Sequence, residues 1–81
     1  MKIKLKLFSI AKDLAGFGED TIEVADAAKA DAVLEYLAQR EPRFRPWRNS
    51  IRLAVNHDYV QGSYSLKDGD EVAVIPPVSG G

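Results

Sequence analysis

The sequence contains no cysteine, and its 81 residues include only one histidine, one methionine and one tryptophan. Without a thiol the chain can form no disulfide, use no thiolate nucleophile and hold no metal through cysteine. Its only histidine, His57, has no second histidine or cysteine beside it, so we expect a surface turn residue and no metal site. The lack of cysteine fits a reducing, cytoplasmic setting.

Neither sign of charge dominates, because the chain has 11 Lys and Arg residues and 12 Asp and Glu residues, which gives a net charge of −1. This balance argues against nucleic acid or an anionic membrane as partner. No apolar run approaches the roughly 20 residues that cross a bilayer. Lys2, Lys4 and Lys6 interrupt the apolar residues at the N-terminus, which is unlike a signal peptide.

The length allows one small domain with a modest core. Such a domain has little room for a deep active site, which favours a carrier or binding module over an enzyme. The segment Gly16-Phe17-Gly18 is not a phosphate-binding loop, because it lacks the third glycine and the strand–turn–helix context.

Apolar residues with a period of two predict strands. In residues 2–8, Ile3, Leu5 and Leu7 alternate with lysines, so one face is buried and the other solvated. We expect a turn over residues 9–18, which joins this strand to the next in a hairpin. Further strands are predicted at residues 21–24, 51–55, 59–60 and 71–75.

A helical period replaces the alternation from about Lys29 and ends near Glu41, because Pro42 disfavours helical geometry in the residue before it. An irregular stretch follows, in which Phe44 or Trp47 is expected to cover the end of the core. The order of elements predicts an α+β domain of the β-grasp, ubiquitin-like type: a mixed sheet of four to five strands with one main helix on one face. We expect residues 1–75 to form this domain and residues 76–81 to be a flexible tail.

The tail is the strongest functional signal. It reads Pro76-Pro77-Val78-Ser79-Gly80-Gly81. Two prolines fix φ and donate no hydrogen bond, so strand pairing ends and the chain leaves stiffly. The small residues that follow can enter a channel too narrow for other sequences, and they bring a single carboxylate to its end. A carboxylate must be activated before it reacts, and nothing in this chain can activate it, so we expect a carrier whose catalytic groups lie in partner proteins.

The chain resembles the small subunit of molybdopterin synthase. The segment from Leu66 to Gly81 carries most of this likeness, above all Asp-Gly-Asp-Glu-Val and Pro-Pro-Val-Ser-Gly-Gly. Residues 8–16 resemble that family's first-strand exit and loop, and residues 54–56 resemble the end of its third strand. The chain departs from the family at Lys12-Asp13, where Arg-Glu is common, and at Ile75, where phenylalanine is frequent.

The resemblance implies a cycle for the chain end. An adenylating enzyme of the ubiquitin-activating type uses ATP on Gly81, and a sulfur donor system converts the carboxylate to a thiocarboxylate. The tail residues Pro76, Pro77, Val78, Ser79 and Gly80 then enter the large synthase subunit, where the sulfur converts cyclic pyranopterin monophosphate to molybdopterin. The small subunit is the sulfur donor of a heterotetramer and binds no cofactor itself.

Apolar residues on the outer, nominally wet face of the sheet predict a partner surface near the tail. These residues are Phe8, Ala54, Ala73 and Ile75. Asp68, Asp70 and Glu71 are expected to form a solvated turn, with steering toward a basic partner as a second possibility.

Three other interpretations stay open. A thiamine-pathway sulfur carrier also ends in Gly-Gly. A ubiquitin-like protein modifier would attach to lysines through Gly81 and give high-mass conjugates. A β-grasp binding module would have an inert tail.

Overall fold

The computed structural model describes residues 1–77, and every structural statement below refers to that part of the chain. Five strands make one sheet: β1 (Lys2–Leu7), β2 (Glu19–Glu23), β3 (Arg52–Val55), β4 (Asp58–Val60) and β5 (Glu71–Ile75). Three helical segments accompany it: α1 (Ser9–Ala15), α2 (Asp31–Arg40) and the 3₁₀ helix η1 (Pro42–Ser50). The predicted tail residues 78–81 lie outside the described residues.

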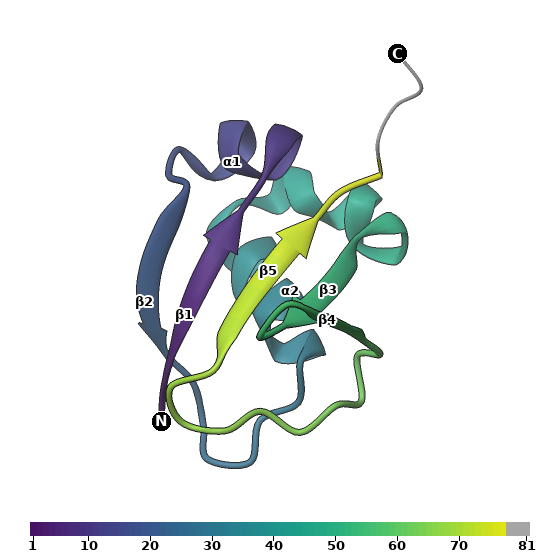
Figure 1. Ribbon diagram of the computed structural model, residues 1–81. Helices are drawn as coiled ribbons and strands as arrows, with labels where there is room; N and C mark the ends of the chain where they lie inside the picture. Colours follow the sequence, from purple (N-terminus) through teal and green to yellow (C-terminus); the bar gives the residue numbers. More distant parts are fainter. Residues whose placement is uncertain (78–81) are drawn as a thin grey trace.

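The strands are ordered β2-β1-β5-β3-β4. The central pair β1 and β5 is parallel, and the other neighbouring pairs are antiparallel. Helix α2 lies behind the sheet, so one face is covered and the other is open (Figure 1). The predicted α+β, β-grasp fold with one main helix is therefore confirmed.

The core lies between the sheet and α2. Alternate residues of β1 and β5 point inward, as a period of two requires, and Leu5, Val72 and Val74 are fully buried. Val33 and Leu37, four residues apart, meet them from one side of α2. This packing fixes β5 at the middle of the sheet, immediately before the predicted tail.

The prediction of a plain turn over residues 9–18 is wrong, because α1 occupies most of it. Ala11 is buried, and Leu14 and Ala15 pack partly against the core. Their spacing places them on one side of the helix, and this short apolar stripe can stabilise only about two helical turns. Gly16 then ends the helix in the left-handed conformation, with φ of 82°, and its N–H donates to the carbonyl of Lys12.

The irregular stretch predicted after Pro42 is the 3₁₀ helix η1. Pro42 stands at its first turn, where a missing N–H costs nothing, and the Glu41 side chain accepts a hydrogen bond from the Arg43 N–H. Phe44 is buried, as predicted, while Trp47 is only half-buried. Neither η1 nor any other described helix is long and apolar enough to cross a membrane.

Candidate functional site

The base of the tail is held through strand β5, from which the tail continues. Strand β5 pairs with β1 on one side and with β3 on the other, and Arg52 lies opposite Ile75 in the last paired position. Pro76 is buried and Pro77 is exposed. The chain is thus anchored up to Pro76, and the domain boundary between residues 75 and 76 stays a prediction.

The four residues predicted as a partner surface lie together. Phe8, Ala54, Ala73 and Ile75 all line one hollow of about 230 Å³ on the open face of the sheet, which we call the outer-face hollow. Its other lining residues are Lys6, His57, Tyr59 and Glu71. A role for this surface in binding a partner stays a prediction.

The register of the sheet explains this hollow. Ala54 of β3 lies directly opposite Ala73 of β5, so two methyl groups meet where larger side chains would fill the space. Phe8 and Tyr59 stand around them and remain 47% and 63% exposed. Ala54 itself is buried although it faces the open side, because these larger neighbours shield it.

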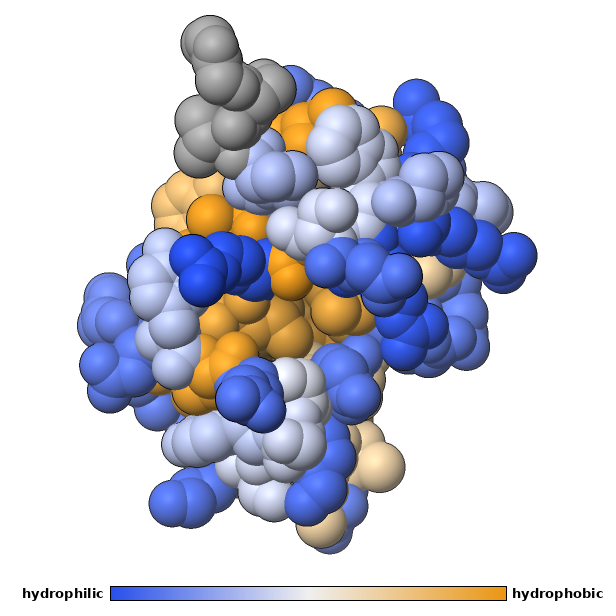
Figure 2. Space-filling model, turned by 90° about the vertical axis from the view of Figure 1, so that its right-hand side faces the viewer, coloured by the Kyte–Doolittle hydropathy of each residue, from blue (hydrophilic) through white to orange (hydrophobic). Residues whose placement is uncertain are grey.

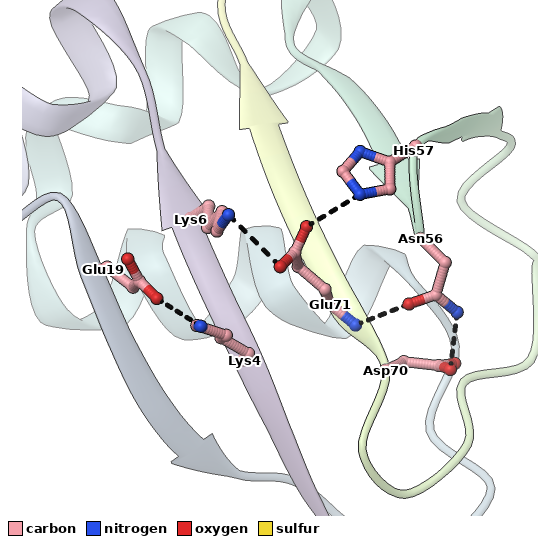
Figure 3. Close-up of polar contacts among 7 residues, drawn as sticks. All are labelled: Lys4, Lys6, Glu19, Asn56, His57, Asp70 and Glu71. Carbon is pink, nitrogen blue, oxygen red and sulfur yellow. Dashed lines mark hydrogen bonds and ion pairs between the residues drawn. The ribbon is translucent and has the colours of Figure 1, made fainter.

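One end of the outer-face hollow is polar, and Figure 3 shows the three side chains there, Lys6, His57 and Glu71. The Glu71 carboxylate lies 3.2 Å from the Lys6 ammonium and 3.7 Å from Nε2 of His57. His57 is highly exposed, as predicted for a turn residue. Asn56 and His57 form the two-residue turn between β3 and β4 with φ of 51° and 76°, a conformation uncommon outside glycine. The turn places the His57 ring over β5, which sequence reasoning missed.

The prediction of a solvated turn is wrong for Asp70, which is only 8% exposed. Its carboxylate accepts hydrogen bonds from the Asn56 side chain at 3.0 Å and from the Lys67 N–H at 2.8 Å. The Asn56 side-chain oxygen in turn accepts from the Glu71 N–H at 3.0 Å. Asp70 therefore ties the β3–β4 turn to the start of β5 and helps to position the polar end of the hollow.

Two exposed ion pairs shift the pKa values of their members. The Lys4 ammonium donates to Glu19 at 2.6 Å, which lowers the pKa of the Glu19 carboxyl and raises the pKa of Lys4. A hydrogen bond from Arg43 likewise lowers the pKa of Glu41. These pairs brace β1 against β2 and cap η1. No group of three or more metal-binding side chains occurs in residues 1–77.

The fold defines a ubiquitin-like β-grasp protein whose central strand leads into a Gly-Gly terminus. Residues 5–81 match the ThiS family, and the chain belongs to that family. It is 39% identical over 83 residues to the molybdopterin synthase sulfur carrier subunit of Chlamydomonas reinhardtii, with both chains covered completely. The predicted resemblance to that group of sulfur carriers is confirmed.

Solved structures agree with this assignment. The putative molybdopterin converting factor subunit 1 of Pyrococcus furiosus superposes with a TM-score of 0.84 at 34% identity, covering 96% of this chain and 99% of that one. The small archaeal modifier protein 1 of Methanosarcina acetivorans superposes with a TM-score of 0.76 at 28% identity, covering 99% and 96%. The first of these proteins is named as a molybdopterin converting factor and the second as a modifier protein.

Proposed function

We propose that this chain is the sulfur carrier of molybdopterin synthase. The observation that carries the proposal is its C-terminal sequence: a central strand, two prolines and a terminal Gly80-Gly81 in a chain similar along its whole length to named sulfur carrier subunits. The prolines give the exit its stiffness, and the glycines offer no side chain that would block a narrow channel.

The proposed cycle needs partner enzymes for each covalent step. A carboxylate oxygen of Gly81 attacks the α-phosphorus of ATP, giving an acyl-adenylate and pyrophosphate. Hydrosulfide from the sulfur donor then displaces AMP, and a thiocarboxylate remains on Gly81. Within the large subunit, this sulfur replaces an oxygen substituent on a carbon of cyclic pyranopterin monophosphate, and water then hydrolyses the acyl–sulfur bond, which restores the carboxylate of Gly81. A dithiolene holds two sulfur atoms, so each molybdopterin consumes two loaded carriers.

The outer-face hollow has a place in this proposal as the docking surface of the large subunit. It is lined by residues of β5, the strand that continues into the tail, so a protein that holds the tail is near enough to cover it. Apolar residues at its centre and an ion-pair cluster at one end match the usual anatomy of a protein interface.

An intact-mass measurement tests the carrier function. The full chain is incubated with its cognate adenylating enzyme, ATP and a sulfur donor. We expect a gain of about 16 Da, the mass difference between sulfur and oxygen, on an acyl group that a nucleophile can attack. The matched control lacks Gly81 and should gain nothing. An unchanged mass of the full chain with a competent enzyme would rule the proposal out.

A protein-modifier function is the second candidate, favoured by the similarity to the archaeal modifier protein. It predicts that cells expressing the tagged chain contain high-mass conjugates joined through Gly81 to lysines. A chain that acts only as a carrier gives none, so a denaturing gel separates the two functions.

A further inference from the structure

A second hollow lies beside β4, outside the surface used in the proposed function. It has a volume of about 710 Å³, and we call it the β4-edge groove. Figure 2 looks at this side of the molecule and shows hydrophobic surface at its centre, bordered by hydrophilic segments. The groove is lined by Leu34, 49–53 and 59–62.

The floor of the groove is an uncovered edge of the core. Leu34 of α2, Ile51 and Val60 are each half-buried and pack against the buried core residues. Strand β4 is only three residues long, so it covers little of the space between the sheet and α2. The exposed apolar surface here is continuous with the core, which makes it suited to receive apolar side chains.

The rim of the groove carries backbone groups that have no partner within residues 1–77. Strand β4 is the last in the sheet, so no described strand lies on its outer side. Successive residues of β3 direct their backbone N–H and carbonyl groups alternately toward β5 and toward β4. The Asn56 N–H donates to the Glu71 carbonyl of β5, so Ala54, two residues earlier, also bonds toward β5. Tyr59 lies opposite Ala54, and its own N–H and carbonyl therefore point away from β3, out of the sheet. An extended segment can pair with them.

The groove has one charge among its described lining residues, the Arg52 guanidinium. Arg52 lies over the Tyr59 ring, 5.1 Å from its centroid, and forms no ion pair with a carboxylate of residues 1–77. Both side chains lie on the outer side of the sheet, opposite to the inward-facing Leu53 and Val60. A strand added here meets apolar side chains on one face and a cation on the other.

The groove also adjoins the outer-face hollow and the base of the tail at Ile75. Arg52 is paired with Ile75, the residue before Pro76, and Tyr59 lines both hollows. A protein that covers the outer-face hollow is therefore within reach of the β4 edge, because Tyr59 belongs to both hollows.

We propose that the β4-edge groove binds an extended segment of the large synthase subunit, which adds a strand to β4. Residues of that segment alternate between the two sides of the sheet. Those on the inner side are apolar and face Leu34 and Val60, and those on the outer side include an acidic residue that faces Arg52. The inference rests on the proposed function for the identity of the partner. It adds a site separate from the tail channel and a pattern that the partner's sequence must contain.

Hydrogen exchange of single amides tests strand addition without any mutation. The isotopically labelled chain is measured alone and in complex with the unlabelled large subunit. We expect the Tyr59 amide to exchange at least about tenfold more slowly in the complex, because it gains a backbone hydrogen bond. The amide of Glu23, which points outward from the opposite sheet edge, is the internal control and should not change. A complex that forms while Tyr59 exchanges as before overturns the proposal.

Charge reversal tests the recognition of an acidic segment. Arg52→Glu should weaken the complex about tenfold or more, whereas Lys2→Glu, which changes the net charge equally at an exposed site far from the groove, should have a small effect. Equal effects of the two variants would show that Arg52 contacts no carboxylate of the partner.

These measurements separate the two proposals. If the chain gains sulfur and binds the large subunit but Tyr59 stays unprotected, the groove inference fails and the carrier function stands. If the native chain does not bind the large subunit at all, both the partner assignment and the groove inference fail.

Discussion

At the scale of single residues, Asp70 and Asn56 determine how the β3–β4 turn sits on β5. The Asp70 carboxylate uses both oxygens for hydrogen bonds within the protein, and the Asn56 side chain bonds to both Asp70 and the Glu71 N–H. A buried carboxylate satisfied in this way specifies one arrangement of the turn, because any other leaves polar groups without partners.

Replacing Asp70 tests this role. Asp70→Ala leaves the Lys67 N–H and the Asn56 amide without their acceptor, so the free energy of unfolding should fall by about 2 kcal/mol. Urea denaturation gives this value, and Asp58→Ala, at an exposed position, should change stability by less than about 0.5 kcal/mol. Equal losses in the two variants would contradict a structural role for Asp70.

The Lys4–Glu19 pair gives a pH dependence with a defined sign. Because the pKa of Glu19 is lowered below its ordinary 4.5 by folding, the pair contributes stability above that pH and loses it as the pH falls through the folded pKa. The raised pKa of Lys4 keeps the contribution intact below 10.5 and removes it in strong base. In Lys4→Met, the Glu19 pKa, followed by NMR titration, should rise toward 4.5. An unchanged Glu19 pKa would show that the ion pair is absent in solution.

At the scale of elements, hydrophobic periodicity predicts the long elements but not the short helical segments α1 and η1. The two long patterns, the alternation of β1 and the stripe of α2, repeat often enough to identify their elements. Helix α1 has seven residues and two glycines close behind it, so its apolar spacing resembles that of a turn. Segment η1 contains two prolines and is held by the burial of Phe44, which becomes visible only when the core is assembled.

Phe44 should therefore carry most of the contribution of η1 to stability. Phe44→Ala removes a ring that is 3% exposed and leaves a cavity, so we expect a loss of about 3 kcal/mol in the free energy of unfolding. Arg45→Ala, at the next and exposed position, is the matched control. Thermal or urea denaturation should separate the two variants clearly, and similar losses would show that η1 is not anchored through Phe44.

At the scale of the whole molecule, α2 covers one face of the sheet, and within residues 1–77 the other face and the β4 edge are left uncovered (Figure 1). The tail base, the outer-face hollow and the β4-edge groove adjoin one another through Ile75, Arg52 and Tyr59. This layout suits a carrier whose partner protein binds the chain end and contacts the adjoining surfaces at the same time.

The sequence by itself determined the β-grasp class, the inward residues of β1 and β5, and the Pro-Pro-Val-Ser-Gly-Gly ending, because each depends on periodicity or on residue type along one segment. It also placed Phe8, Ala54, Ala73 and Ile75 on one face. Only the tertiary structure showed that a hollow forms around Ala54 and Ala73, that Asp70 is buried, and that the strand edge at Tyr59 has no partner within residues 1–77. Each of these depends on which strands become neighbours and in which register, and that pairing joins residues far apart in the chain.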